Sequence, residues 1–474
     1  MSLRDLRDFI SMLRAEGELL EVDKEVDINY EIGDICKALH SQPNPKAILF
    51  NKIKDYSGWR MCCNILGSFK RVSMMFNGAP MEALVDYYLR RIEKPIPPVE
   101  VARREAPCKE VVLKEGELSF TKLPIPIWHP GDGGPYITLG IQVCRDPVSG
   151  ASNLAILRQM IVGPREASLN ALPGKRTYIF YREREERGEP LEVAIVIGVE
   201  PAIQVAACHS ATSLDEDEYA VAGALKGEPI EVVKCETIDV MVPARAEVIV
   251  EGIVPPNERV SDGKFGEFTG YLSGVRQNPK FVIKCITHRS NPIFQATYEG
   301  MPPVEDHIFK SIPYSAAIQK VVSSICPGVS GVWLPPAGGT MLWGVVRLRK
   351  MYPGHAKHAM NAVWATHIGK YIKFLVVVDD DVNIYDPNAV IWAISMRVQP
   401  HRDLVLETNS TSIQLDPSAS HLGVTSKLGI DATEKLPEEG GPPPDLKPTL
   451  IDHSPSIYWQ SICKVGLLRY LSLE

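Results

Sequence analysis

Two carboxylates stand five residues apart in the glycine-rich stretch SDGKFGEFTGYLSG, which runs from Ser261 to Gly274. The acids are Asp262 and Glu267, and the four glycines around them allow tight turns and a close approach to a ligand. A buried carboxyl group with a raised pKa can donate a proton near neutral pH, while a nearby arginine keeps a second acid ionised. A solvated surface turn explains the same pattern, so the stretch alone leaves both interpretations open.

An arginine occurs in the apolar run SNLAILRQM, where Arg158 follows Asn153 by five residues. An arginine in an apolar strand needs a carboxylate or phosphate partner, either in a ligand site or in an internal salt bridge. Residues at an odd separation point to opposite faces of a flat strand. If Asn153 and Arg158 serve one site, the strand must bend or bulge between them.

A third acid, Glu236, lies between apolar residues in VVKCETIDVMVPA. A carboxylate in such a setting either pairs with a base or binds a cation. The side-chain oxygens of Asn153 and Glu236 would form a hard donor set that suits Mg²⁺ or Mn²⁺ rather than zinc. Pairing of Glu236 with Lys234 on a surface strand explains the pattern equally well.

Other polar clusters favour structural explanations. The runs DEDEY (215–219) and REREER (182–187) are typical of solvated helix faces. The acids of VVVDDDVNIYD follow a predicted strand, where such acids more commonly cap the next helix than bind a metal. Three single histidines could line a pocket, although structural or surface positions are commoner for isolated imidazoles: His129, His307 and His367.

The elements that must position these residues fall into three parts. Helical periodicity predicts helices over 2–17, 29–40 and 81–92 in an N-terminal α/β domain, residues 1–106. From 107 to 310, many short β-type runs with turns between them predict a barrel or sandwich, interrupted by a helix near 214–226. From 311 to 474, helices and strands alternate as in an α/β domain, and a tail helix follows the proline-rich joint 437–448.

Composition narrows the class of protein. The chain has 474 residues with 45% hydrophobic and 23% charged residues, ordinary values for a soluble globular protein. A net charge of -7 and the absence of a basic block argue against nucleic-acid binding. The charged N-terminus shows no signal peptide, and no apolar run is long enough to span a membrane. We therefore expect a cytoplasmic protein whose ten scattered cysteines are reduced and mostly buried.

Taken together, these segments resemble the UbiD family of prenylated-FMN-dependent decarboxylases, over nearly the whole chain. The most specific matches are the Asn-x4-Arg of NLAILR, the block KCETIDVMVPA and FGEFTGY, which also occur in the family's order and spacing. LRDFISMLRAEGELLEVDKEVD, LPIPIWHPGDGGPY and VVVDDDVNIYDPNAVIWA extend the resemblance towards both ends. Within the family, the chain resembles the hydroxybenzoate- and phenylphosphate-type members, which favours an aromatic acid as the substrate.

The resemblance implies that the central region is a flavin-reductase-like split β-barrel that binds prenylated FMN. Asn153 and Glu236 match residues that hold a divalent metal, usually Mn²⁺, which bridges to the cofactor phosphate, and K⁺ often accompanies it. Residues 153–158, which include Ile156 and Leu157, match the segment that cradles the cofactor. The matches to the family's catalytic network are Arg158, Asp262 and Glu267, with Glu267 at the proton-donor position.

The chain departs from the family pattern in two places. LPGKRTYIF has Lys175 and Arg176 but no histidine where the family often supplies a third metal ligand, and either cation could contact the cofactor phosphate. The first network acid is Asp262, one methylene shorter than the commoner glutamate. A phosphate-binding lysine is also expected from the C-terminal half, for which Lys357 and Lys370 are candidates.

The implied reaction is reversible, non-oxidative decarboxylation of an unsaturated or aromatic acid. Two segments are expected to line the pocket between the barrel and the C-terminal domain: TYEGMPPVED (297–306) and SIPYSAAI (311–318). A flavin prenyltransferase would supply the cofactor, and the resemblance implies a homodimer or a hexamer of dimers. The alternatives are a flavin-binding subunit of a larger carboxylase complex and a split-barrel flavin oxidoreductase, although the latter has no need of the Arg158 network.

Overall fold

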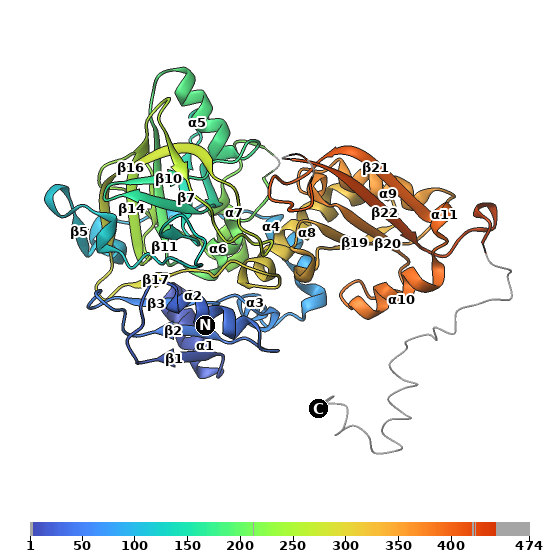
Figure 1. The fold of residues 1–474 in the computed structure, drawn as a ribbon, viewed down its shortest axis with the longest axis horizontal. Helices are drawn as coiled ribbons and strands as arrows, with labels where there is room; N and C mark the ends of the chain where they lie inside the picture. Colours follow the sequence, from blue (N-terminus) through green and yellow to red (C-terminus); the bar gives the residue numbers. More distant parts are fainter. Residues whose placement is uncertain (1–2, 212, 420, 422, 442–474) are drawn as a thin grey trace, which may run out of the picture.

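The computed structural model describes residues 3–211, 213–419, 421 and 423–441. Within them, four β-sheets form, with four, ten, three and five strands. Figure 1 shows the N-terminal part (blue) against the central part (cyan to yellow), with the C-terminal part (orange to red) beside them. The chain is therefore a mixed α/β multidomain protein, as the sequence predicts.

The N-terminal part is a small sheet with helices packed on it. Its strand order is β1-β2-β3-β17, so the fourth strand comes from far along the chain. Helix α1 is amphipathic, and its buried residues Leu6, Phe9, Ile10 and Leu13 recur at helical spacing. The elements are α1 (Leu6–Ala15), β1 (Leu19–Val22), α2 (Glu31–His40), β2 (Ala47–Phe50), β3 (Arg60–Cys63), α3 (Phe69–Met75), α4 (Leu84–Ile92) and β17 (Ile293–Gln295).

The central part is dominated by the ten-stranded sheet, whose main path is β6-β9-β10-β16-β14-β11-β7-β8. This path has two ends, so the described strands do not close into a barrel, and the split barrel remains a prediction. The strands of the central part are β4 (Val99–Glu100), β5 (Val111–Leu113), β6 (Tyr136–Ile137), β7 (Ile141–Arg145), β8 (Ser152–Ile156), β9 (Gln159–Gly163), β10 (Glu166–Leu169), β11 (Leu191–Ile197), β12 (Glu231–Lys234), β13 (Met241–Pro243), β14 (Val248–Val254), β15 (Arg259–Asp262) and β16 (Arg276–His288). Its helices are α5 (Arg176–Glu186), α6 (Pro201–Ala206) and α7 (Glu218–Lys226).

Strand β11 shows why the central sheet is apolar on both faces. Val193, Ile195 and Ile197 belong to one buried core, whereas Ala194 and Val196 belong to the other. Side chains of a strand alternate between its two faces, so consecutive apolar residues fill two cores at once. One of these cores continues into the N-terminal helices and the C-terminal sheet, which joins the three parts.

The C-terminal part is a five-stranded sheet in the order β18-β19-β20-β22-β21, with helices on it (Figure 1). Its first helix, α8 (Glu305–Ile325), packs against β18 and extends back to the central part. The other elements are β18 (Val329–Trp333), β19 (Trp343–Leu348), α9 (His355–Trp364), β20 (Phe374–Val378), α10 (Pro387–Arg397), α11 (Pro400–Asp403), β21 (Leu404–Thr411) and β22 (Val424–Ala432). The predicted tail helix lies outside the described residues.

The domain boundaries stay a prediction, but two features cross them. Strand β17 completes the N-terminal sheet, and the boundary after residue 310 falls inside α8. The nine cysteines in the described part are free and buried, as expected. None of the helices in this part is both long enough and apolar enough to span a membrane.

Candidate active site

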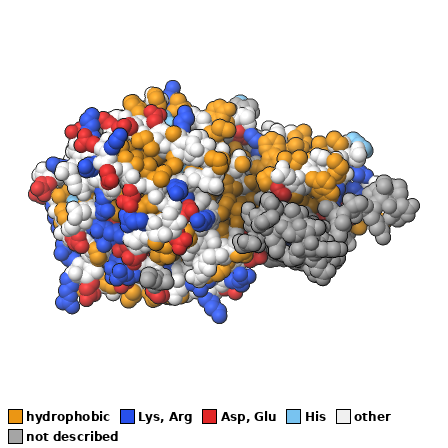
Figure 2. Space-filling view, turned by 90° about the horizontal axis from the view of Figure 1, so that it is seen from below, with side chains coloured by type: hydrophobic (Ala, Val, Ile, Leu, Met, Phe, Trp, Pro, Cys, Tyr) orange, Lys and Arg blue, Asp and Glu red, His pale blue; other side chains and the backbone are white. Residues whose placement is uncertain are grey.

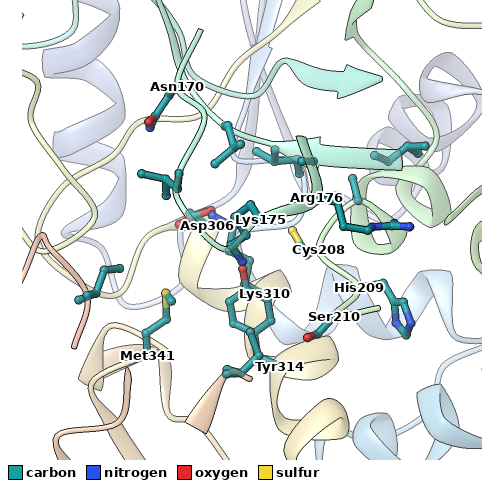
Figure 3. Close-up of a pocket in the computed structure, with 18 of the residues that line it drawn as sticks. Asn170, Lys175, Arg176, Cys208, His209, Ser210, Asp306, Lys310, Tyr314 and Met341 are labelled. Atoms are coloured by element: carbon teal, nitrogen blue, oxygen red, sulfur yellow. The ribbon is translucent and has the colours of Figure 1, made fainter. Parts of the chain in front are cut away.

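A cavity of about 330 Å³ is lined jointly by the central part, helix α8 and C-terminal loops. Figure 3 shows side chains from several elements converging on it. Both segments that the sequence predicts to line a pocket contribute, through Glu299, Asp306 and Tyr314, while His367 and Leu415 come from the C-terminal part. The predicted pocket at this junction is therefore confirmed.

The strand that carries Asn153 ends before Arg158, as predicted for the case in which both residues serve one site. Strand β8 ends at Ile156 and β9 begins at Gln159, so Leu157 and Arg158 lie between the two strands. As a result, Asn153, Ile156, Leu157 and Arg158 all line the cavity.

Arg158 contacts both acids of the glycine-rich stretch. Its Nη2 atom donates to Oδ2 of Asp262 at 2.7 Å, and its Nη1 atom lies 2.7 Å from Oε1 of Glu267. The guanidinium carbon also lies 5.4 Å from the centre of the Phe265 ring, within the range of a cation–π contact. The two acids and the arginine thus form one buried network beside the cavity.

Glycines shape the loop that carries Glu267. A Cβ atom on Gly266 would lie 2.4 Å from the ring of His129, so a larger residue does not fit there. Gly270 has φ +81°, a left-handed conformation that favours glycine, and its N–H donates to the carbonyl of Glu267 at 2.8 Å. The chain therefore reverses immediately after Glu267, which lets Glu267 and Asp262 face the same arginine.

Burial and charge act in opposite directions in this network. Burial raises the pKa of Glu267, and the positive charge of Arg158 partly offsets this effect. The pKa of Asp262 is raised by burial in the same way, against the pull of Arg158. Burial would lower the pKa of Arg158, but Glu267 and Asp262 together raise it. A permanently charged arginine beside a carboxyl group that holds its proton more tightly suits proton transfer.

Asn153 lies beside an acid that the sequence pattern did not single out. Its amide nitrogen donates to Oγ1 of Thr177 at 2.9 Å. The next residue, Leu154, donates its backbone N–H to Oε2 of Glu218 at 3.1 Å. Glu218 begins helix α7, lines the cavity and forms an ion pair with Arg176. The predicted solvated face of DEDEY is therefore wrong at Glu218, which is buried.

The structure does not bring Glu236 to Asn153, which corrects the prediction of a metal shared by the two. Glu236 follows β12 and does not line the cavity. Its carboxylate lies 2.8 Å from Arg103 and within 4 Å of Lys109 and Lys114. These cations lower the pKa of Glu236 despite its partial burial. The alternative pairing with Lys234 is also absent from the described contacts, since Lys234 pairs with Asp239.

Cations gather at one end of the cavity. Lys175 and Lys310 line it, and Figure 3 shows them close together, with Asp306 paired to Lys310. Burial, with the charges of Lys310 and Lys370 nearby, lowers the pKa of Lys175 to about 8. Within the described part of the chain, the Lys175 amine has neither a hydrogen bond nor an ion pair. An anion from outside would therefore fit this end.

The two candidate lysines of the C-terminal half lie differently. Lys370 is near enough to Lys175 and His367 to lower the pKa of both, although burial has the larger effect on each. The pKa of His367 falls to about 4 in this setting, so the imidazole is neutral at pH 7. Lys357 is exposed on α9 and does not line the cavity.

His307 lines the cavity and also holds a neighbouring loop. His307 accepts from the Val304 N–H at 3.0 Å and uses its other ring nitrogen to contact the Phe268 carbonyl at 2.9 Å. Burial lowers the pKa of His307 to about 4, so this ring holds the Glu267 loop as a neutral group.

Acids of the other polar runs form ion pairs within the protein. Asp379 and Asp381 pair with Arg397. Glu185 of REREER is buried against Arg259, contrary to the predicted solvated face.

Family models match three consecutive stretches of the chain. They are the N-terminal domain (residues 10–94), the Rift-related domain (residues 99–302) and the C-terminal domain (residues 307–432) of 3-octaprenyl-4-hydroxybenzoate carboxy-lyase, UbiD. Together they cover most of the 474 residues.

Several solved structures are similar over almost their full length. The UbiD-class enzyme HmfF from Pelotomaculum thermopropionicum, in complex with FMN, is 33% identical, with 95% of this chain and 98% of that chain covered and a TM-score of 0.85. The closed form of vanillic acid decarboxylase from Sedimentibacter hydroxybenzoicus is 30% identical (98% and 99% covered, TM-score 0.89). The 3,4-dihydroxybenzoic acid decarboxylase from Klebsiella pneumoniae is 28% identical (97% and 99% covered, TM-score 0.84). By the extent of these matches, the chain belongs to the UbiD family of carboxy-lyases.

Proposed function

We propose that this protein is a prenylated-FMN-dependent decarboxylase of an aromatic carboxylic acid, with Glu267 as the proton donor. The observation that carries the proposal is the contact of one buried arginine, Arg158, with both Asp262 and Glu267 at the wall of the cavity. The similar proteins support it, because they include an HmfF in complex with prFMN and decarboxylases of vanillic and dihydroxybenzoic acid.

The residues of the cavity fit a flavin phosphate. Lys175 has no partner of its own in the described part, and Lys310 lies near it. A phosphate between such amines would gain charge-assisted hydrogen bonds and would relieve their mutual repulsion. The wall beyond them is apolar at Ile156, Leu157 and Ile179, which suits the flavin ring. We therefore assign Asn153, Ile156, Leu157, Arg158 and Lys175 to the cofactor.

A divalent metal fits beside that phosphate if Glu218 takes the place predicted for Glu236. Asn153 and Glu218 present amide and carboxylate oxygens from β8 and α7, and Mg²⁺ or Mn²⁺ typically binds such groups together with phosphate oxygens and water. No group of three or more His, Cys, Asp or Glu side chains forms a metal site in the described ranges. The metal would thus depend on the phosphate, and it would displace Arg176 from Glu218. No residue is assigned to K⁺.

The protein's own contribution to the reaction is charge and position. When bound, prenylated FMN would supply an electron sink for the electrons left behind when CO₂ departs. Arg158 would orient the substrate carboxylate while it holds the Glu267 side chain in place. Glu267 then delivers its proton to the carbon that has lost CO₂. Asp262 keeps Arg158 fixed, and like-charge coupling helps Glu267 to retain its proton. In the reverse direction, Glu267 accepts the proton, so the same residues serve carboxylation.

The test of this function is release of CO₂. The chain would be produced together with a flavin prenyltransferase, its proposed supplier of cofactor, and incubated with a panel of aromatic acids. Release of CO₂ from at least one acid supports a decarboxylase. Nicotinamide-dependent flavin reduction without CO₂ release would support an oxidoreductase instead. Flavin binding without either reaction would support a flavin-binding subunit of a larger carboxylase.

Asn153→Ala and Glu218→Gln are expected to purify with less bound flavin than the wild-type protein. Asn153→Ala removes an oxygen ligand of the proposed metal, and Glu218→Gln replaces a charged carboxylate ligand with a weaker neutral amide. Loss of such ligands or their supporting contacts commonly lowers metal affinity 10- to 100-fold. Flavin absorbance and manganese content of the purified protein measure the effect. Glu236→Gln is the matched control, because its carboxylate pairs with Arg103 away from the cavity. Equal flavin loss in all three variants would contradict the assignment.

A homo-oligomer is also part of the proposal. Figure 2 shows apolar side chains more densely over the C-terminal part, whereas charged side chains spread over the N-terminal and central parts. Ile391 and Met396 on α10 and Leu406 on β21 contribute to this apolar surface and are all at least 60% exposed, and contiguous apolar surface often marks a protein–protein contact. A second copy of the chain could cover them. Light scattering should then give a multiple of the 52.5 kDa chain mass, and a mass of 52.5 kDa would contradict it.

A further inference from the structure

One buried acid of the cavity has no part in the network around Arg158. Glu299 lies between β17 and α8, lines the cavity and is only 8% exposed. Its Oε2 atom is buried and has no hydrogen-bond partner among the described residues. The backbone at this point is held, because the ring of His129 contacts the Glu299 carbonyl at 3.0 Å. An unpaired buried oxygen costs free energy, so its persistence in a cavity indicates a role with a ligand.

The surroundings of Glu299 decide which form of the carboxyl group is present. Burial raises the pKa of Glu299 well above its usual value, and the nearby negative charges of Asp306 and Glu267 add to this effect. Lys310 opposes the shift, but its amine is already paired with Asp306. These effects favour the neutral, protonated form of the Glu299 side chain. In this form it has one O–H donor and free acceptor oxygens.

A neutral acid in this position selects among ligand groups. A ligand anion finds better partners in Arg158 and Lys310, which both line the cavity. A ligand cation would meet the positive charge of Lys310. An apolar substituent would leave the buried Oε2 atom of Glu299 unpaired. A hydroxyl group matches best, because it can donate to one oxygen of the acid and accept from the other.

We infer that Glu299 binds a ring hydroxyl group of the substrate, so that the protein prefers hydroxylated aromatic acids to their unsubstituted analogues. This inference rests on the proposed function for the identity of the reaction, but not for the binding preference. Glu299 is then a specificity-determining residue, whereas Glu267 carries the proton to carbon. The segment TYEGMPPVED thus contributes a specific contact with the substrate hydroxyl group, in addition to lining the cavity.

The test compares two variants on three acids: para-hydroxybenzoate, meta-hydroxybenzoate and benzoate. For the loaded enzyme, Glu299→Leu is expected to lower kcat/KM for the preferred hydroxybenzoate about 10- to 100-fold, the range for a buried group left unpaired. The same change should alter kcat/KM for benzoate less than about 3-fold. Glu299→Gln keeps a donor and an acceptor at the same place, so it should retain most of the preference. Flavin absorbance confirms equal loading of the variants.

Binding gives a second measurement that does not need turnover. Titration calorimetry of the flavin-loaded protein with each acid should show tighter binding of a hydroxybenzoate than of benzoate, and Glu299→Leu should remove this difference. If no acid is decarboxylated but the difference is present, the proposed function fails and the Glu299 assignment stands. Equal losses for hydroxylated and unsubstituted acids, or no binding of any of the three, would overturn the assignment. Loss of turnover in Glu299→Gln on both substrate types would instead make Glu299 part of proton delivery.

Discussion

Glu267→Gln is expected to retain bound prenylated FMN but to lose turnover by about 100- to 10,000-fold, the range for removal of a general acid. The amide has nearly the same shape as the acid and can still lie against Arg158, but it cannot deliver a proton to carbon. The measurements are CO₂ release and exchange of the product C–H with deuterium from solvent. Both should fall together, because both need the same proton transfer.

The pH dependence of the wild-type protein gives an independent check on Glu267. Decarboxylation needs the protonated acid, so the rate should fall as the pH rises through the pKa of Glu267. Burial raises that pKa, which moves the fall towards neutral pH. The residual rate of Glu267→Gln should lack this limb of the profile. Glu166→Gln, a change at an exposed acid paired with Lys280, is the matched control and should behave as the wild type. Full activity in Glu267→Gln would disprove the assignment.

Arg158→Met is expected to be the most destabilising of these changes. It leaves Asp262 and Glu267 buried beside each other without their shared cation, and breaking a buried pair in this way typically costs about 3–5 kcal/mol of unfolding free energy. Chemical denaturation at pH 7 measures the loss. In the variant, both acids would have raised pKa values in the folded state, which then binds protons more tightly than the unfolded chain. Its stability should therefore increase as the pH is lowered.

A triple variant tests whether that loss comes from the unpaired acids. Arg158→Met combined with Asp262→Asn and Glu267→Gln removes all three charges together, and replacing an entire buried ion pair is often neutral for stability. The triple variant should regain most of the unfolding free energy while remaining inactive. If it is as unstable as Arg158→Met alone, packing of the arginine stem explains the effect, and the charge network does not.

The part of the site that could be predicted lies close together along the chain. Asp262 and Glu267 lie five residues apart, and Gly270, with its left-handed backbone, allows the turn that follows Glu267. The odd spacing of Asn153 and Arg158 predicted a bend between them if both serve one site, and β8 does end at Ile156. Such features depend on local backbone geometry, which the sequence encodes directly.

The part that was missed depends on contacts between distant segments. Glu218 reaches β8 only because α7 packs there, 64 residues away from Leu154 in the chain. In sequence it is one of four acids in DEDEY, and only the apolar residues that follow it, Val221, Ala222 and Leu225, hint at a buried helix start. Glu236 has more apolar neighbours in the sequence than Glu218 has. In the structure, however, its carboxylate lies beside the charged side chains of Arg103 and Lys114. Strand β17 likewise joins a sheet that no local pattern connects to it.

Helix α8 has a consequence for altering this protein by design. Asp306, Lys310 and Tyr314 recur every four residues on one side of it and line the cavity, while Phe309, Ile312 and Ala316 belong to the buried core that extends into the C-terminal sheet. Helix α8 thus lines the cavity with one side and packs into the shared hydrophobic core with the other. Protein interiors are close-packed, so adding or removing one methylene at Ile312 should shift helix α8 and with it the side chains on its cavity-lining side. A search for new substrate range should therefore include this hidden side, although Phe309, Ile312 and Ala316 do not line the cavity.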